Sequence, residues 1–212
     1  MPFVERAELT SIDTIASVGS ITIDPPELLF PTKVLSSFDT DFDSYKEDMI
    51  EWMRLYSLEN ESNSRSNFGG YQSPDNFYFE DSFAPYMNRI AEQIDCTVEE
   101  YINDESTELH PGSLQVCNMW FNFNYENCYN VTHTHPGCVL AGVFWIQCDE
   151  SCPIVFECVD SFSRASITKA VSETFEATPG TMMIFPAHLP HRVDINRKKK
   201  PRISMSFNLV KK

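Results

Sequence analysis

Residues 114–124 read LQVCNMWFNFN, and this stretch decides the fold class. Its side chains alternate, with Met119, Phe121 and Phe123 on one face and the row Asn118, Trp120, Asn122 and Asn124 on the other. A period of two is typical of a β-strand, because successive side chains point to opposite faces. The polar row faces either solvent or, in a barrel that encloses a ligand, the interior.

Similar runs follow this stretch along the second half of the chain. Strand-like segments lie at 139–147, 154–157, 181–185 and 203–209, separated by Gly, Pro, Asp and Asn residues. Many short strands in succession favour a sandwich or a barrel over a parallel α/β sheet.

The first half of the chain has a helical pattern instead. Apolar residues recur at spacings of three and four over 43–56, which predicts an amphipathic helix capped by Asp41 or Asp43. A second helix is expected over about 80–103, and the polar stretch 59–76 is interpreted as a loop.

The length of 212 residues fits one domain. We therefore expect a single domain over 1–212, in which a helix-containing part, 1–110, flanks a strand-rich core, 111–212. Prolines interrupt the apolar segment 20–38, which predicts short extended pieces there.

The charge of the chain is strongly acidic, with 31 Asp and Glu against 16 Lys and Arg and a net charge of −15. An acidic body repels phosphate backbones, so nucleic acid is not an expected partner. The basic run 197–200 is either a phosphate-binding patch or, as is more common, a solvated loop.

No apolar run reaches the roughly 18 residues of a membrane helix, and MPFVERAELT does not resemble a signal peptide. We expect a soluble, cytoplasmic protein without a membrane partner. Seven cysteines, an odd number, are then expected to be reduced. A zinc site built on Cys148 and Cys152, with Cys158 as a third ligand, is an alternative use of these thiols.

Four of the five histidines fall in two short clusters, His133-Thr-His135 and His188-Leu-Pro-His191. His133 and His135 would share one face of a strand, and a histidine from a distant strand could complete a metal site. His191 is our candidate for that third ligand. His188 is its rival, although Pro190 argues against a regular helix that would place both on one face.

Arg202 and Ser204 follow the second histidine cluster on one face of a predicted strand. A guanidinium group can hold a carboxylate through two hydrogen bonds, and a serine hydroxyl can add a third. The same pattern also fits the exposed end of a surface strand next to the basic loop.

Taken in order, several motifs resemble those of the 2-oxoglutarate/Fe(II)-dependent oxygenases. They are His133-x-His135-Pro-Gly, LAGVFW at 140–145, IVFE at 154–157, PGTMMIFP at 179–186, His191 and RISMSFN at 202–208. A largely uncharacterised group from phage and bacterial genomes is the most similar, and GGYQS at 69–73 resembles its upstream loop. The resemblance spans about 67–210.

This resemblance implies a double-stranded β-helix, the jelly roll also found in cupins, flanked by helices. It implies that His133 and His191 are the first and last iron ligands. Arg202 and Ser204 match the family's Arg-x-Ser, which holds the far carboxylate of 2-oxoglutarate. Trp120 and Asn122 are expected to line the same cosubstrate site.

The chain departs from the family pattern at His135, where the usual ligand is a carboxylate. We expect His135 to be a genuine ligand. A carboxylate recruited from elsewhere, Glu157 ahead of Asp160, is the alternative. Three neutral ligands would leave the charge of Fe(II) to be offset by the cosubstrate dianion.

The resemblance implies a non-haem Fe(II)- and 2-oxoglutarate-dependent oxygenase that uses O2, hydroxylates a small-molecule or peptide substrate and releases succinate and CO2. A cupin-like metal-binding or structural jelly roll without turnover is the alternative. The substrate and the oligomeric state stay open, with a homodimer as one candidate. Residues 1–66 and the loop at 69–76 are expected to shape the substrate pocket.

Overall fold

The computed structural model describes residues 17–18, 21–22, 32–63, 65–103, 109–110, 112–149, 153–158 and 172–212. Met1–Thr32 and Lys33–Lys212 form two separate units. In the first unit, β1 (Ser17–Val18) and β2 (Ile21–Thr22) form an antiparallel pair. The other extended pieces expected over 20–31 lie outside the described residues.

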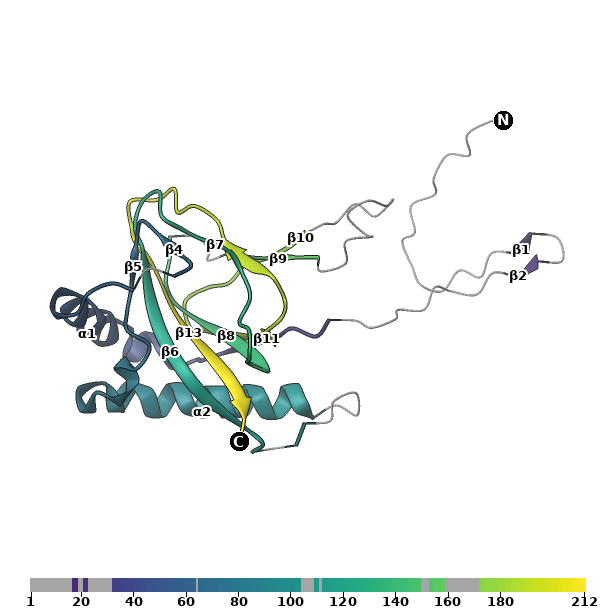
Figure 1. The fold of residues 1–212 in the computed structure, drawn as a ribbon, viewed down its shortest axis with the longest axis horizontal. Helices are drawn as coiled ribbons and strands as arrows, with labels where there is room; N and C mark the ends of the chain where they lie inside the picture. The colour runs from purple at the N-terminus through teal and green to yellow at the C-terminus, as the bar shows by residue number, and fades with distance from the viewer. Residues whose placement is uncertain are drawn as a thin grey trace. The chain divides into compact units, whose positions relative to one another are not determined.

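Two antiparallel sheets build the second unit (Figure 1). The larger sheet has the order β3-β11-β8-β13-β6-β5. Its strands are β3 (Leu35–Phe38), β11 (Thr181–Pro186), β8 (Leu140–Gln147), β13 (Arg202–Lys211), β6 (Leu114–Asn124) and β5 (Tyr71–Gln72).

The smaller sheet has the order β10-β9-β12-β7-β4. Its strands are β10 (Ser172–Phe175), β9 (Ile154–Glu157), β12 (His191–Val193), β7 (Tyr129–His133) and β4 (Asn67–Phe68). β3, β4 and β5 come from the part of the chain before residue 110, so that part contributes strands to both sheets as well as helices.

Two helices cover the outer face of the larger sheet: α1 (Lys46–Glu59) and α2 (Ala84–Ile102). Short 3-10 helices precede them at η1 (Phe42–Ser44), η2 (Phe77–Phe79) and η3 (Asp81–Phe83). Both predicted helices are confirmed, but the expected cap is wrong. Tyr45 precedes α1 without a side-chain cap, and the Asp41 carboxylate pairs with Arg89 instead.

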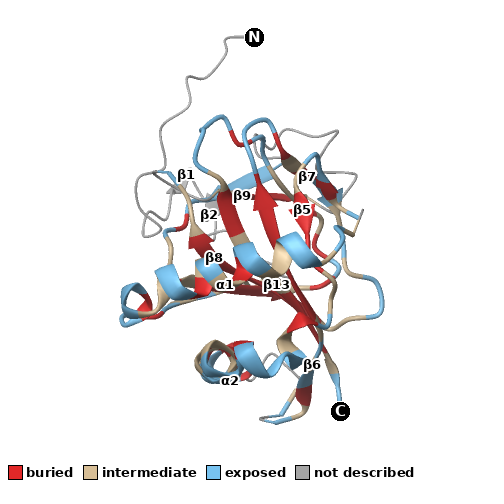
Figure 2. Cartoon of the chain, turned by 90° about the vertical axis from the view of Figure 1, so that its left-hand side faces the viewer, coloured by how far each residue is buried: buried red, intermediate tan, exposed pale blue. Residues whose placement is uncertain are grey.

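Alternation along the central strands divides the interior into two regions. Met119, Phe121 and Phe123 of β6 pack with Met205 and Phe207 of β13 against the helices. The opposite faces of β8 and β11 pack toward the smaller sheet in a second apolar cluster. Both faces of the larger sheet are therefore covered, as the buried strands in Figure 2 show.

The polar row of β6 faces this space between the sheets. Trp120, Asn122 and Asn124 are all buried. Of the two interpretations left open by the sequence, the interior one is confirmed. The loop expected over 59–76 is wrong in part, because β4 and β5 form there, and Gln72 pairs with Asn122.

The Asp39 carboxylate joins the end of β3 to both helices. It accepts hydrogen bonds from Arg89 Nη2 at 2.9 Å, from Tyr45 Oη at 2.6 Å and from the Asp41 amide at 3.0 Å. Burial acts to raise the pKa of Asp39, but the bonds from Arg89, Tyr45 and Asp41 outweigh it and hold the pKa below its usual value.

We predict that Asp39→Asn lowers the free energy of unfolding by about 1–3 kcal/mol at pH 7, because the hydrogen bonds to a charged acceptor are lost. A depressed folded-state pKa stabilises the protein above the unfolded pKa, and this advantage disappears as the pH falls through the folded value. The difference between the two proteins should therefore shrink below about pH 4. Urea unfolding at pH 7 and pH 3 measures it.

Glu51→Gln is the control, because Glu51 pairs with Arg54 on the exposed face of α1. Exposed pairs contribute little, so this variant should unfold like the unchanged protein. A deficit in Asp39→Asn that stays the same at pH 3 would show that the charge of Asp39 is not its source.

Candidate metal centre and cosubstrate site

Strand pairing brings the histidines of the two sequence clusters together. His133 is the last residue of β7, and it lies opposite His191, the first residue of β12. His135 lies two residues beyond the end of β7, where its backbone N–H donates to the Ala187 carbonyl at 2.8 Å. The expectation that one strand carries both His133 and His135 is therefore wrong, although their side chains still converge.

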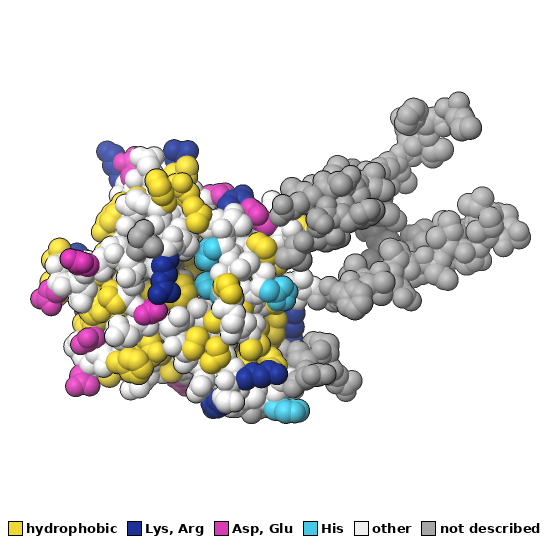
Figure 3. All heavy atoms as spheres, in the orientation of Figure 1, with side chains coloured by type: hydrophobic (Ala, Val, Ile, Leu, Met, Phe, Trp, Pro, Cys, Tyr) yellow, Lys and Arg dark blue, Asp and Glu magenta, His cyan; other side chains and the backbone are white. Residues whose placement is uncertain are grey.

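The three imidazoles form a compact cluster. One nitrogen from each of His133, His135 and His191 lies within 4.8 Å of the others. Nε2 of His135 and Nε2 of His191 are 3.2 Å apart. Among the described residues, this is the one group of three or more potential metal-ligating side chains. Figure 3 shows histidine side chains at the surface in the orientation of Figure 1.

Backbone carbonyls fix the tautomers of two of these rings. Nδ1 of His133 lies 2.8 Å from the Val131 carbonyl, and Nδ1 of His191 lies 2.9 Å from the Leu189 carbonyl. A carbonyl only accepts, so each Nδ1 carries the proton and donates it. The lone pair of each neutral ring is then on Nε2, as a metal ligand requires.

Burial keeps the cluster neutral. It lowers the pKa of His133, and together with the neighbouring rings it lowers the pKa of His135 to about 4 and of His191 to about 3. His135 Nε2 and His191 Nε2 are 3.2 Å apart, so without a cation the His135 ring can donate from Nε2 to the lone pair on His191 Nε2. A cation between the two rings would instead bind both Nε2 lone pairs. Neutral imidazoles suit a transition metal, so these residues fit the metal that the sequence predicts.

The rival candidates do not join the cluster. His188 is exposed in the turn before β12. Glu157 follows Phe156, whose ring packs near His191, and therefore points to the opposite face of β9. There its carboxylate accepts hydrogen bonds from Arg192 at 2.8 Å and from Thr132 at 3.1 Å. Asp160 lies outside the described residues.

The cysteines give no support to the zinc alternative. Cys148 is disulfide-bonded, so the expectation of reduced thiols does not hold for this residue. A sulfur in a disulfide is not a thiolate ligand. Cys152 lies outside the described residues.

Arg202 is a buried cation on the same face of β13 as Ser204. It is 7% exposed, and its Nη2 donates to the Asp194 carbonyl at 2.8 Å. Within the described ranges no carboxylate forms an ion pair with Arg202. Asp194 offers Arg202 only its backbone carbonyl, because its side chain pairs with Arg192. Burial accordingly lowers the pKa of Arg202 to about 10. Such a group favours binding of an anion.

Asn124, directly opposite Arg202 on β6, was not among the predicted cosubstrate ligands. Its side-chain nitrogen is buried without a hydrogen-bond partner. A free amide donor beside an unpaired guanidinium fits a carboxylate. The strand register opposite Arg202 is the signal that could have identified it.

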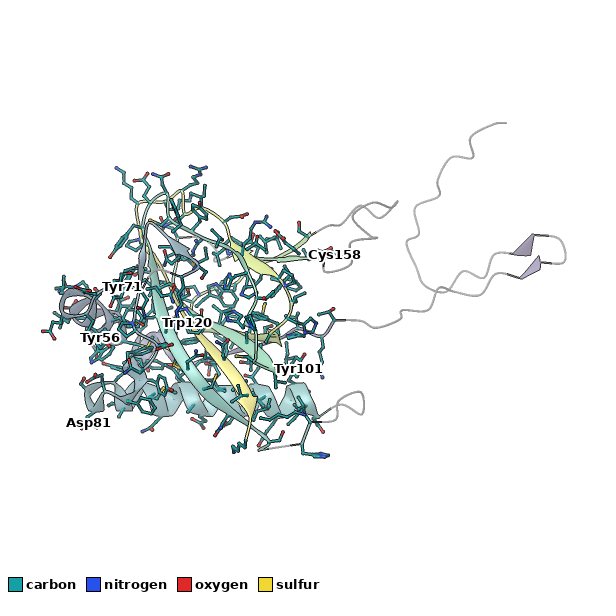
Figure 4. All side chains as sticks on the ribbon, viewed as in Figure 1. Tyr56, Tyr71, Asp81, Tyr101, Trp120 and Cys158 are labelled. Carbon is teal, nitrogen blue, oxygen red and sulfur yellow. The ribbon has the colours of Figure 1, made fainter. Side chains whose placement is uncertain are left out.

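A narrow space lies between the histidines and Ser204 of β13. It has a volume of about 30 Å³, and its lining includes Trp120, Asn122, Ser204 and the three histidines. Such a volume holds about two waters, so a five-carbon cosubstrate requires movement of the lining side chains. Figure 4 shows Trp120 at the centre of the described fold.

The double-stranded β-helix expected from the sequence is confirmed by comparison with solved structures. The non-haem α-ketoglutarate-dependent epimerase SnoN from nogalamycin biosynthesis has a TM-score of 0.58 and 15% identity, covering 85% of this chain and 77% of that one. A Pseudomonas putida prolyl-4-hydroxylase has a TM-score of 0.54 and 13% identity, covering 85% and 94%. At these identities the likeness establishes the fold.

HygX from Streptomyces hygroscopicus, solved with nickel and 2-oxoglutarate bound, is similar over 85% of this chain and 83% of its own. Its TM-score is 0.60 at 8% identity. A search of curated proteins found no match.

The fold and the histidine cluster define a jelly-roll protein with a candidate metal centre. Residues 118–208 match the family described as "Putative 2OG-Fe(II) oxygenase", where 2OG is 2-oxoglutarate. Fe(II) and 2-oxoglutarate are typical of it. Among the described residues no helix is long and apolar enough to span a membrane.

We predict that His191→Ala lowers Fe(II) affinity at least about tenfold, because even the loss of a group that hydrogen-bonds to a metal ligand costs about 10–100-fold. His133→Ala and His135→Ala should behave alike. His188→Ala, in the same turn but pointing to solvent, is the matched control and should bind metal normally. Anaerobic metal analysis measures the occupancy, and full occupancy in His191→Ala would refute the assignment.

Proposed function

We propose that this protein is a mononuclear non-haem Fe(II) oxygenase that hydroxylates its substrate and couples this reaction to conversion of 2-oxoglutarate and O2 into succinate and CO2. The observation that carries the proposal is the buried, unpaired Arg202 on the strand that runs past the histidine cluster. A metal-binding jelly roll without turnover has no need of such a cation.

In this proposal His133, His135 and His191 hold the metal, and the carbonyls of Val131 and Leu189 keep two of the rings oriented. Phe156 and Phe185 pack beside His191 and exclude water from it. When bound, Fe(II) and 2-oxoglutarate supply the O2 chemistry and the electrons for hydroxylation.

Arg202 holds the far carboxylate of 2-oxoglutarate, and the free amide of Asn124 adds a donor. Ser204 lies two residues along β13, about 7 Å closer to the histidines. Trp120 and Asn122 line the space between them. Residues that keep the two ends of the cosubstrate in fixed positions lower the entropic cost of reaching a reactive geometry.

Three neutral ligands leave both positive charges of Fe(II) uncompensated by the ligands themselves. The 2-oxoglutarate dianion then offsets them, so each partner should raise the affinity for the other by the same factor. Glu157 does not offset the charge of Fe(II) in this proposal, because it pairs with Arg192 on the other face of β9.

Arg202→Ala should weaken binding of 2-oxoglutarate by about 2–5 kcal/mol, the cost of removing one partner of a buried charge pair, which is tens-fold or more in Kd. Arg202→Lys should also bind poorly, since a point charge does not replace the fork. Anaerobic calorimetry on the Mn(II)-loaded protein measures the affinity.

Arg197→Ala, which removes an exposed arginine of the basic loop, is the matched control and should bind normally. Metal content should be largely unchanged in all three variants. If Arg202→Ala and the unchanged protein bind 2-oxoglutarate with equal affinity, Arg202 does not hold the cosubstrate. If succinate never forms with Fe(II), 2-oxoglutarate and O2, and 2-oxoglutarate does not raise the Tm, the cupin-like alternative holds.

A further inference from the structure

A second pocket opens beside the histidines, on the side away from Arg202. Its volume is about 410 Å³, and His133 and His135 form part of its wall. Gln72 of β5, Asn118 and Trp120 of β6 and Asn208 of β13 also line it. Arg202 and Asn208 lie six residues apart on one face of β13, about 20 Å by strand geometry. The pocket therefore lies at the opposite end of β13 from the cosubstrate anchor.

The Gln72 carboxamide is the unusual group in this pocket. Gln72 is 2% exposed, and Oε1 is buried without a hydrogen-bond partner. Nowhere in the described part of the chain does its side chain form a hydrogen bond. A buried amide that the protein leaves unbonded costs free energy, so it calls for a ligand that both donates and accepts.

Asn208 adds a second free acceptor. Its Nδ2 donates to Asn118 Oδ1 at 2.8 Å, which leaves Asn208 Oδ1 buried and without a partner. Two carboxamide oxygens that line one pocket, those of Gln72 and Asn208, therefore lack donors.

The charges around the pocket restrict the ligand further. Arg65 lines the pocket and pairs with Asp75 at 3.3 Å, and no carboxylate is among the lining residues that the structure describes. A cationic ligand would meet no counter-charge and would be repelled by a metal on the histidines. A carboxylate would place an oxygen against the free Gln72 Oε1. The pocket therefore suits a neutral polar group.

We propose that this pocket binds the primary substrate through a primary carboxamide group. Such a group pairs with Gln72 in both directions, because one of its N–H groups donates to Gln72 Oε1 and its carbonyl accepts from Gln72 Nε2. Asn208 Oδ1 lies four residues further along β6 by strand register and is left for a second donor of the same ligand. The histidines in the wall place the atoms next to the carboxamide close to the metal. This inference rests on the proposed function, because it assigns the pocket to the substrate of that reaction.

The test measures binding of N-acetylglutamine methylamide by ligand-observed NMR, with N-acetylglutamate methylamide as the isosteric carboxylate. Chelator is present, so that no probe binds through a metal and the result is independent of turnover. The carboxamide should bind at least about tenfold more tightly than the carboxylate, which is about 1.4 kcal/mol. Benzamide and a glutamine-containing pentapeptide distinguish a free small molecule from a peptide side chain.

Gln72→Leu should lower the affinity for the carboxamide about tenfold while leaving the Tm equal or higher, because the side chain that is lost forms no hydrogen bond within the described protein. Gln93→Leu is the matched control. Gln93 also has a buried, unpartnered oxygen, but it lies on α2 and donates to Ser37. It should bind the probe normally.

Unchanged affinity in Gln72→Leu, or equal binding of carboxamide and carboxylate, would overturn the inference. If the carboxamide fails to bind while 2-oxoglutarate is still converted to succinate, the inference fails and the proposed function stands. If the carboxamide binds but no succinate forms, the proposed function fails instead.

Discussion

The antiparallel pairing of β6 with β13 holds two rows of side chains in register, and each row meets a different environment. One row is apolar and packs against the helices. The other row contains Trp120, Asn122 and Asn124 on β6 and Arg202 and Ser204 on β13. A shift of one residue would send the guanidinium into the helix-facing core and the phenylalanines into the polar space. The apolar row thus fixes where the polar row lies.

The metal centre depends on the smaller sheet in the same way. β12 lies between β9 and β7, so its first residue, His191, lies opposite His133 on one side and Phe156 on the other. The cluster is therefore held by backbone ladders and by two carbonyls, and its rings need no carboxylate to orient them. Among the residues that the structure describes, the site therefore has no negative charge of its own.

Much of this arrangement could be predicted from the sequence. The period of two in LQVCNMWFNFN gave the bounds of β6, and the apolar spacing gave both helices. The histidines were recognised because they stand in short clusters. Side-chain periodicity, however, does not show which face of a strand is covered by a second sheet, so the environment of the polar row needed the structure.

Other features had too weak a local signal. β4, β5 and β12 have two or three residues each, too few for alternation to appear, and they form because longer neighbours pair with them. The end of β7 at His133 was missed because the sequence shows its turn only at Pro136 and Gly137, which begin three residues beyond His133. Gln72 and Asn124 looked ordinary in the sequence, since an unpaired amide is recognised only from its surroundings.

One strand, β13, carries Arg202 near its start and Asn208 near its end, with the histidines alongside. The two ends can therefore diverge independently during evolution. Exchange of small polar residues at the Asn208 end, or on the two-residue β5 at the sheet edge, would alter what is recognised there. The chemistry at the Arg202 end would be inherited unchanged. Under the proposed function, a descendant of this chain could therefore change its substrate without changing the residues that hold the cosubstrate.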